Sequence, residues 1–365
     1  MALLVAGHPV GAQEGLSCRA CVIVDESGRV LFARAARTAR ANASTTKIVT
    51  ALVVRDHTTT DEVVTVSPVA AGTTGGGLDL APGEHYRVED LLYALLLTSS
   101  NQAAVALAEH VAGSEAAFVE MMNRTALSLG ATSTRFVTAH GLDVPGHYSS
   151  PRDLARFALE LLEDPLLAAI VADPQTSIAS RRGRVILENR NVLLEGYRGA
   201  TGVKTGYTAR AGDVLVASAT RGDRLLVAVT MGATSDEAAA REAAALLDKG
   251  WNLLARTEVL AGGRPIATLI FDPAGATDVI IERGVRGPWL ASALEVAFEP
   301  DPRVRPPLVA GETVGRAVVR ADGRVVASVP AIARSGIPAP PRSWGQSLLT
   351  AVLSLFGGLV EQVTE

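Results

Sequence analysis

Three short motifs in this sequence combine residue types that can transfer an acyl group. Ser44-Thr45-Thr46-Lys47, Ser99-Ser100-Asn101 and Lys204-Thr205-Gly206 stand in that order along the 365 residues. Each motif alone is weak evidence, because S-x-x-K is commonly a helix N-cap with a solvated lysine and K-T-G is commonly a turn. Together, in a chain with only three lysines, they indicate a single reaction site.

The use of lysine supports this interpretation. The chain contains Lys47, Lys204 and Lys249 as its lysines, against 31 arginines. Arginine keeps its proton in proteins, whereas a buried lysine can have its pKa lowered enough to act as a base. Because two of the three lysines lie inside the motifs, we expect them to perform chemistry that arginine cannot.

Ser44 and Lys47 have the spacing of a nucleophile and its base. We predict that a helix begins at Ser44, which places the hydroxyl at the positive end of the helix dipole. Lys47, three residues later, returns to the same face within reach of that oxygen. Burial and a second cation such as Lys204 would lower the pKa of Lys47, so that it could accept the Ser44 proton. The prediction is an acyl ester on Ser44.

The middle motif lies between two predicted helices. The hydroxyl of Ser99 can face the site there and relay a proton to a leaving amine. The amide of Asn101 can bind a substrate carbonyl or steady Lys47.

The third motif ends a predicted strand and is suited to hold a substrate. The Lys204 cation and the Thr205 hydroxyl match a carboxylate, and Gly206 lets an extended substrate lie along the strand edge. We expect the backbone N–H groups of Ser44 and Tyr207 to bind the oxyanion, an effect worth about 3 to 4 kcal/mol for each donor.

The elements that must position these residues change in character along the chain. A hairpin is expected over about 19–34, and a helical middle is followed by period-two strands and a long helix that Ser235 caps. The expected helices cover about 44–55, 88–98, 101–112, 115–129, 151–162 and 236–255, and the expected strands cover 62–67, 185–191, 202–206, 213–220 and 224–231. A sheet built from both ends of this segment, with a helical cluster between, fits the order.

The chain divides into four stretches. We predict an α+β catalytic domain over 18–256 and a small all-β domain over 257–337. Residues 338–365 are expected to form a stiff linker and an amphipathic helix from Trp344 to Val363, either an interfacial membrane anchor or a helix docked on the β-domain or another subunit. Residues 1–17 are either the later part of a clipped secretory signal or an ordinary apolar N-terminus.

Composition excludes other classes of site. With a net charge of -4 and no block of Lys and Arg, the chain has no pattern for nucleic acid. Its six histidines show no paired ligand spacing, so neither a metal nor an organic cofactor is expected. Cys18 and Cys21 are placed at the start of a strand, where two small buried residues are expected, and a disulfide between them stays open.

The three motifs resemble those of the penicillin-binding proteins and serine β-lactamases. The match is closer to the low-molecular-mass D-alanyl-D-alanine carboxypeptidases. The stretches that carry it are 43–48, 88–93, 140–143, 148–153, 202–208 and 241–242. The resemblance covers about 18–255, and the later β-rich region, including 307–315, is similar to the C-terminal domain of that subfamily. It implies an α+β transpeptidase-like fold of a helical cluster and an antiparallel sheet.

This resemblance implies a substrate and a compartment. Ser44 would attack the carbonyl between the last two D-alanines of a peptidoglycan stem peptide, release D-alanine and be freed by water. Penicillin and other β-lactams would acylate the same serine. The protein would be exported and attached to the outer face of the cytoplasmic membrane. Arg241 matches a family arginine near the carboxylate end of the site, although it could be a helix surface charge, and His140 matches a histidine on a neighbouring loop.

Two departures and two rivals accompany the resemblance. The middle motif is usually Ser-Gly-Asn followed by Asp, but here Ser100 and Gln102 take the second and fourth places, and Tyr207 stands where His usually follows K-T-G. A β-lactamase would share the motifs, but the Glu-x-x-Leu-Asn of class A enzymes is missing from the sequence. A penicillin-sensing or wall-binding module that acylates without turnover would also keep them.

Overall fold

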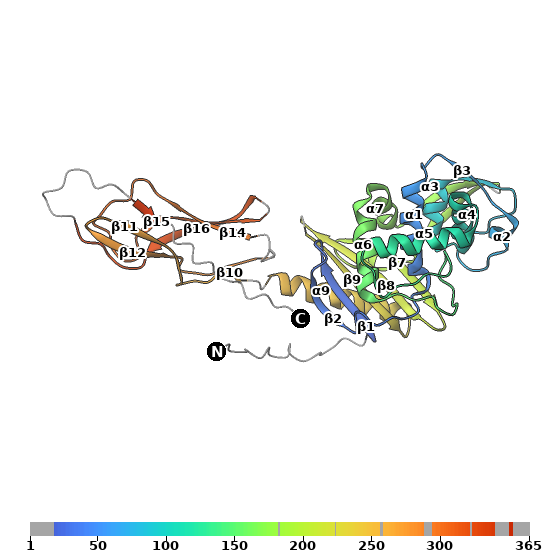
Figure 1. The fold of residues 1–365 in the computed structure, drawn as a ribbon, viewed down its shortest axis with the longest axis horizontal. Coiled ribbons are helices and arrows are strands. Elements are labelled where there is room, and N and C mark those ends of the chain that lie inside the picture. The colour runs from blue at the N-terminus through green and yellow to red at the C-terminus, as the bar shows by residue number, and fades with distance from the viewer. Residues whose placement is uncertain are drawn as a thin grey trace. The chain divides into compact units, whose positions relative to one another are not determined.

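The computed structural model describes residues 18–181, 183–222, 224–255, 258–287, 294–321, 323–339 and 350–352. Its chain contacts divide it into two compact units, Met1–Gly250 and Trp251–Glu365. The three motifs all lie in the first unit. Figure 1 gives the element labels used below.

An antiparallel five-stranded sheet forms the base of the first unit. Its order is β2-β1-β9-β8-β7, so the N-terminal hairpin pairs through β1 with a single strand, β9, about 200 residues later. The strands are β1 (Ala20–Asp25), β2 (Val30–Arg34), β7 (Ala200–Thr208), β8 (Gly212–Arg221) and β9 (Arg224–Ala233). This arrangement confirms the predicted sheet made from the two ends of the segment.

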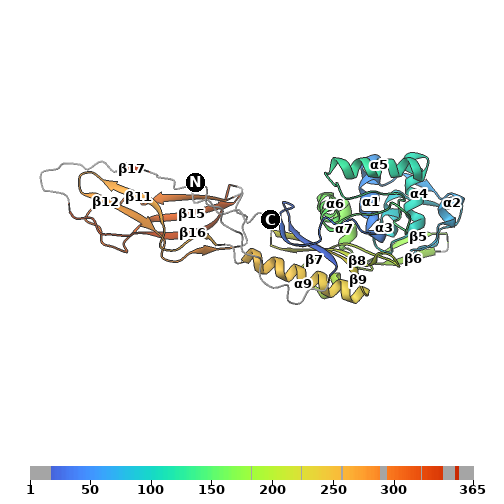
Figure 2. The ribbon, with the colours of Figure 1, turned by 60° about the horizontal axis from the view of Figure 1, so that its bottom comes forward.

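Helices cover both faces of this sheet. Helix α9 (Asp236–Ala255) lies on one face and the remaining labelled helices lie on the other (Figure 2). Gly250 allows the close packing of α9, because a Cβ there would stand 2.6 Å from Ile23 Cδ1 and 2.8 Å from Leu226 Cδ1. On the opposite face α6 (Pro151–Glu163) packs against β9 and β1.

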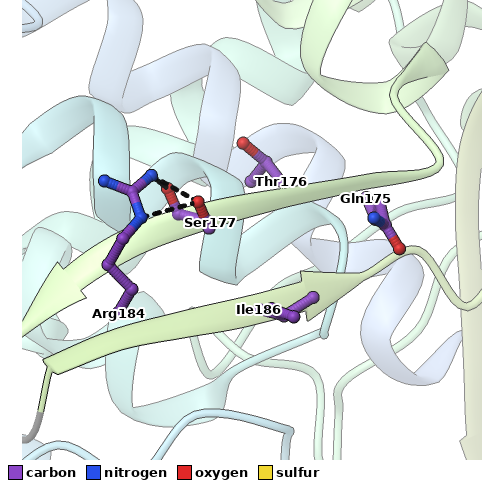
Figure 3. Close-up of a pocket in the computed structure, with 5 residues that line it drawn as sticks. All are labelled: Gln175, Thr176, Ser177, Arg184 and Ile186. Carbon is purple, nitrogen blue, oxygen red and sulfur yellow. Dashed lines mark hydrogen bonds between the residues drawn. The ribbon is translucent and has the colours of Figure 1, made fainter.

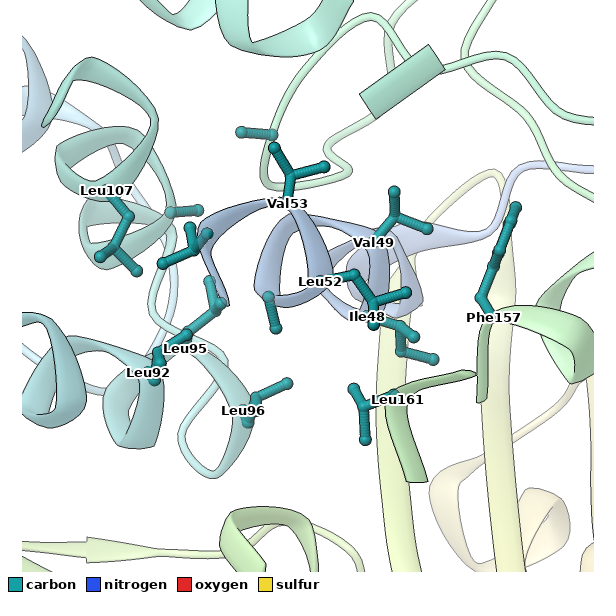
Figure 4. Close-up of a cluster of buried hydrophobic side chains, with 14 of the residues drawn as sticks. Ile48, Val49, Leu52, Val53, Leu92, Leu95, Leu96, Leu107, Phe157 and Leu161 are labelled. Carbon is teal, nitrogen blue, oxygen red and sulfur yellow. The ribbon is translucent and has the colours of Figure 1, made fainter. Parts of the chain in front are cut away.

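Helix α1 (Lys47–His57) runs through the middle of the helical group. Its first eight residues are all buried, and its apolar side chains contact their neighbours on several sides (Figure 4). The surrounding helices are α3 (Val88–Leu96), α4 (Asn101–Ala112), α5 (Glu115–Ser128) and α7 (Pro165–Ala172). Because α1 is enclosed, the residues at its N-terminus are held rigidly.

Several short elements were not expected from the sequence. Helix α7 has the uniformly apolar sequence Pro-Leu-Leu-Ala-Ala-Ile-Val-Ala, which lacks the period of a half-buried helix. The other unexpected elements are the helices α2 (Pro68–Gly72) and α8 (Leu193–Gly196) and the strands β4 (His85–Arg87) and β5 (Gln175–Ser180). Strand β4 pairs with β3 (Val63–Thr65) and β5 pairs with β6 (Gly183–Glu188), and both partners lie near predicted strands.

After the end of α9, the described part of the second unit is built from strands. A six-stranded antiparallel sheet has the order β14-β15-β16-β12-β11-β17, and β10 (Glu258–Leu260) pairs with β13 (Val285–Arg286). The sheet strands are β11 (Pro265–Phe271), β12 (Gly275–Ile280), β14 (Leu294–Pro300), β15 (Thr313–Ala321), β16 (Arg324–Ala333) and β17 (Thr350–Val352). The α+β catalytic fold followed by a sheet-rich region agrees with the predicted fold class.

Part of the expected C-terminal helix is corrected by the structure. Thr350–Val352 form strand β17, whose backbone pairs with β11, so an open strand edge outweighs the helical period in these three residues. The rest of the expected helix, and residues 1–17, lie outside the described residues. In the part of the chain that is described, no helix is long and apolar enough to cross a membrane.

The Cys18–Cys21 pair is buried, and its sulfurs form a disulfide. Both residues are buried, as expected, and the disulfide that the sequence left open is present because β1 begins only at Ala20. Cys18 therefore precedes the strand and is free to turn toward Cys21.

Candidate active site

Ser44 lies in a 3-10 turn that leads into α1. The turn spans Ala43–Thr46, and Ala43 before the serine has a φ of 47°, in the left-handed region that costs a residue with a Cβ about 1 to 2 kcal/mol. Ser44 is half-buried, and its Oγ is 3.0 Å from Nζ of Lys47. The structure therefore brings the expected nucleophile and base into contact.

Lys47 is fully buried beneath this turn. Its Nζ also donates to Oδ1 of Asn101 at 2.6 Å and to the carbonyl oxygen of His140 at 2.8 Å. Burial, followed by the charges of Lys204 and Arg190, lowers the pKa of Lys47 well below its usual value. A lysine held in this way can be neutral and accept a proton.

Ser99 occupies the sharp turn between α3 and α4. Its φ is 63°, and its Oγ is buried without a hydrogen-bond partner among the described residues. The next residue, Ser100, caps α4 by accepting a hydrogen bond from the N–H of Ala103 at 3.1 Å. The hydroxyl of Ser99 is thus available for a substrate or a proton.

A glycine-rich loop packs directly on the middle motif. A Cβ at Gly76 would stand 2.4 Å from Cα of Ser100, and one at Gly75 would stand 2.7 Å from Nδ2 of Asn101. Asn101 Nδ2 donates to the carbonyl oxygen of Thr74 at 2.7 Å. Only glycine permits this close approach.

Gln102, which stands where the family usually has Asp, makes two hydrogen bonds to the backbone beside the glycine-rich loop. Its Oε1 accepts from the N–H of Leu80 at 2.8 Å, and its Nε2 donates to the carbonyl of Ala71 at 2.6 Å. These two residues flank the glycine-rich loop. The amide of Gln102 therefore ties together both ends of the loop that Asn101 contacts.

Strand β7 brings the third motif to the same place. Lys204 is buried, and its Nζ donates to the carbonyl of Thr205 at 3.0 Å. Burial and the charge of Arg190 lower the pKa of Lys204 to about 7, against a smaller opposing effect of Asp236. A Cβ at Gly206 would stand 2.9 Å from the backbone nitrogen of Ser44, so glycine lets the strand lie against the serine.

Tyr207 projects from the strand after this glycine. Its side chain is 66% exposed, so the change from the usual histidine alters the surface beside the site. The next residue, Thr208, donates to Oδ1 of Asp143 at 2.8 Å, and Asp143 Oδ2 accepts from the N–H of Arg210. The end of β7 is thereby fastened to the 140–143 loop.

His140 and Arg241 differ in their relation to this cluster. The carbonyl of His140 binds Lys47, while its buried ring lies 3.6 Å from Glu115 Oε1. Burial, helped by the charges of Lys47 and His147, lowers the pKa of His140 to about 4, so its ring is neutral at pH 7. Arg241 is exposed on α9, where hydrogen bonds from the Glu237 backbone N–H and from Ser235 lower the pKa of Glu237 and the charge of Arg241 adds a smaller effect.

Arg190 is a site residue that the sequence analysis missed. It follows β6, and its backbone N–H donates a hydrogen bond to the carbonyl of Leu97 at 3.3 Å, close to the middle motif. Its charge lowers the pKa of both Lys47 and Lys204. Arg190 is one of 31 arginines and lies outside any motif, so the sequence gave no signal for it.

Two surface pockets are lined by residues outside the three motifs. One, of about 580 Å³, lies on the β5–β6 hairpin, where the guanidinium of Arg184 binds Ser177 (Figure 3). The other, of about 440 Å³, is lined by the glycine-rich loop and Gln102. Within the described ranges, no group of three or more His, Cys, Asp or Glu side chains is placed to hold a metal ion.

Comparisons with known proteins show the family of this chain. Residues 9–235 match the peptidase S11 family model, described as D-alanyl-D-alanine carboxypeptidase. The chain is 33% identical to D-alanyl-D-alanine carboxypeptidase DacC of Escherichia coli (strain K12), over 88% of this chain and 84% of that protein. It is also 29% identical to DacF of Bacillus subtilis (strain 168), over 86% and 84%.

Solved structures show the same fold. Penicillin-binding protein 5 of Haemophilus influenzae matches with a TM-score of 0.64 and 27% identity, over 90% of this chain and all of that one. The Streptomyces K15 DD-transpeptidase matches with a TM-score of 0.63 and 28% identity, over 66% of this chain and all of that one. On the evidence of the family model, the relatives and the shared fold, this chain belongs to the serine D-alanyl-D-alanine carboxypeptidase family of penicillin-binding proteins.

Proposed function

We propose that this protein removes the terminal D-alanine from peptidoglycan stem peptides through an acyl-enzyme on Ser44. The observation that carries the proposal is the 3.0 Å contact between Ser44 Oγ and the buried Lys47 Nζ. Membership of the D-alanyl-D-alanine carboxypeptidase family supports the substrate class. We assign catalysis to the domain predicted over 18–256.

Acylation begins with the transfer of one proton. Neutral Lys47 takes the Ser44 hydroxyl proton as Oγ attacks the carbonyl carbon between the two D-alanines. The N–H groups of Ser44 and Tyr207 stabilise the oxyanion. When the C–N bond breaks, the proton passes through the Ser99 hydroxyl to the leaving amine, and D-alanine departs. Water then attacks the ester, gives a proton back to Ser44 and releases the shortened peptide.

The terminal carboxylate of the substrate is held at the other end of the site. The Lys204 cation and the Thr205 hydroxyl bind it, and the positive charge of Arg190 adds to the local field. Asn101 steadies Lys47 through the 2.6 Å hydrogen bond, and Gly206 leaves room for the substrate backbone. We assign His140 a role through its carbonyl oxygen, and Arg241 a longer-range contribution at the carboxylate end.

We propose that the reaction takes place outside the cytoplasm, where peptidoglycan is assembled, and the relatives' names as D-alanyl-D-alanine carboxypeptidases support this. We further propose that the protein is exported and attached to the outer face of the cytoplasmic membrane by its C-terminal residues. Deletion of residues 339–365 tests the anchor. Release of the protein from the membrane fraction supports it, and retention contradicts it.

Mass spectrometry of the penicillin adduct tests the site. We expect one penicilloyl group on Ser44, no adduct in Ser44→Ala, and strongly slowed labelling in Lys47→Arg, because a guanidinium cannot accept the proton. A label on any other residue contradicts the assignment.

A second assay separates the carboxypeptidase from its two rivals. Release of D-alanine from a D-Ala-D-Ala peptide with a long-lived penicillin adduct supports the proposal. Rapid turnover of penicillin would indicate a β-lactamase, and a stable adduct without D-alanine release would indicate a sensor.

A further inference from the structure

A buried polar cluster lies directly behind the nucleophile and has no part in the reaction steps above. It consists of Asn42, Thr46 and His147, all at most 4% exposed. The ring of His147 lies 2.8 Å, through Nε2, from Oγ1 of Thr46. Its other nitrogen, Nδ1, accepts the N–H of Val137 at 3.1 Å.

These contacts fix where the proton of His147 resides. A backbone N–H can only donate, so Nδ1 must present a lone pair to Val137. Burial, followed by the effect of Lys47, lowers the pKa of His147 to about 4 although Asp143 opposes it, so the ring is neutral at pH 7. The single proton of a neutral ring then sits on Nε2. His147 is therefore a donor to Thr46.

The direction of the next hydrogen bond follows. Thr46 Oγ1 accepts from Nε2 of His147 and from Nδ2 of Asn42 at 2.9 Å, which uses both of its lone pairs. Its own hydrogen must then point to the carbonyl of Ala43, 2.8 Å away. Gly141 packs directly against this hydrogen bond, because a Cβ at Gly141 would stand 2.0 Å from Ala43 O and 2.6 Å from Thr46 Oγ1.

The carbonyl of Ala43 and the N–H of Ser44 belong to one planar peptide group. A hydrogen bond that fixes the carbonyl therefore also fixes the direction of the N–H. Ala43 holds a left-handed φ of 47°, which a residue with a Cβ adopts only when its surroundings impose it. The cluster supplies such a constraint at the peptide group immediately before the nucleophile.

We propose that His147 is a positioning residue that, through Thr46, aims the backbone N–H of Ser44 at the oxyanion. This inference rests on the proposed acylation of Ser44. It predicts an effect on the acylation rate constant and little effect on the initial non-covalent complex, because the oxyanion exists only in the transition state and the tetrahedral intermediate.

The test compares acylation by a fluorescent penicillin in three single variants. His147→Leu removes both hydrogen bonds, and we expect the acylation rate constant to fall at least about 10-fold, on the scale of a weakened oxyanion donor. His147→Gln keeps a donor near the position of Nε2, and we expect recovery to within about three-fold. Thr46→Val removes the hydroxyl with little change in shape, and we expect the same loss as in His147→Leu.

Phe136→Leu is the matched packing control. The Phe136 ring meets that of His147 edge-on at 5.6 Å, so this change disturbs the same packing and leaves the hydrogen bonds in place. We expect a lower Tm and an acylation rate constant like that of the wild type. The double variant Thr46→Val with His147→Leu should be no slower than Thr46→Val alone, because both changes break one chain of contacts.

The outcomes separate this inference from the proposed function. If the wild type acylates Ser44 and Thr46→Val does so with the same rate constant, the positioning role alone is overturned. The Thr46→Val measurement decides the question if His147→Leu does not fold. The positioning role is also overturned if the acylation rate constant falls equally in His147→Leu and Phe136→Leu, or if the two losses in rate constant add in the double variant. Failure of the wild type to acylate Ser44 overturns the proposed function itself.

Discussion

Gly206 lies against the peptide group of Ser44, so that a Cβ on Gly206 would stand 2.9 Å from the Ser44 nitrogen and 3.1 Å from the Thr45 nitrogen. Real Cβ atoms essentially never approach backbone atoms at the shorter of these distances. Strand β7, proposed to bind the substrate, and the turn that carries the proposed nucleophile are thus brought together by the absence of a side chain.

Gly206→Ala should therefore separate the strand from the turn. We expect the acylation rate constant for penicillin to fall roughly 10²-fold, on the scale of one lost oxyanion donor. Gly196→Ala is the matched control, because nothing lies within 4 Å of a Cβ at that position. Wild-type acylation in Gly206→Ala would contradict the close approach.

The pKa of Lys204, lowered to about 7, predicts a pH dependence. Below this pH Lys204 is a cation that can bind the substrate carboxylate, and above it the side chain becomes neutral. We expect kcat/KM for D-alanine release to decline as the pH rises through about 7, with the change mainly in KM. Lys204→Arg should flatten this decline, because guanidinium stays charged. An unchanged alkaline limb in that variant would rule out Lys204 as its source.

Arg190→Gln should shift the whole pH profile. The charge of Arg190 lowers the pKa values of Lys47 and Lys204, so its removal should raise both. We expect both limbs of the kcat/KM profile to move to higher pH. Arg124→Gln, at an exposed position on α5, is the charge-matched control and should leave the profile in place. A profile that does not move in Arg190→Gln would show that its charge does not reach the lysines.

Gln102→Ala should loosen the glycine-rich loop. The change leaves the buried N–H of Leu80 and the carbonyl of Ala71 without the amide, and we expect a loss of about 1 to 3 kcal/mol in the free energy of unfolding. Acylation should also slow, because Asn101 donates to Thr74 of the same loop. Gln102→Glu keeps the acceptor for Leu80 but places a carboxylate oxygen against the Ala71 carbonyl in a buried site, so it should lose at least as much stability at pH 7. Equal urea midpoints for wild type and Gln102→Ala would contradict this role.

The sequence by itself predicted Ser44 and Lys47 as a pair, and the structure brings the two side chains into contact. Their separation of three residues lies within one helical turn, so local geometry is enough to join Ser44 and Lys47. Regular patterns also predicted most long helices and the strands on both sides of them. Helix α7 escaped prediction because its apolar sequence has no period, and Thr350–Val352 departed from the expected helix because a strand edge was available.

Only the tertiary structure decided what surrounds that pair. Asn101 and His140 reach Lys47 across 54 and 93 positions, and Thr46 meets His147 across 101. Arg190 and Gln102 carry no motif, and their importance comes from what the fold places beside them. Burial and charge act through distance in space, whereas sequence patterns report only neighbours along the chain. The lowered pKa of Lys47, on which its proposed role as the base depends, is therefore a property of the folded protein.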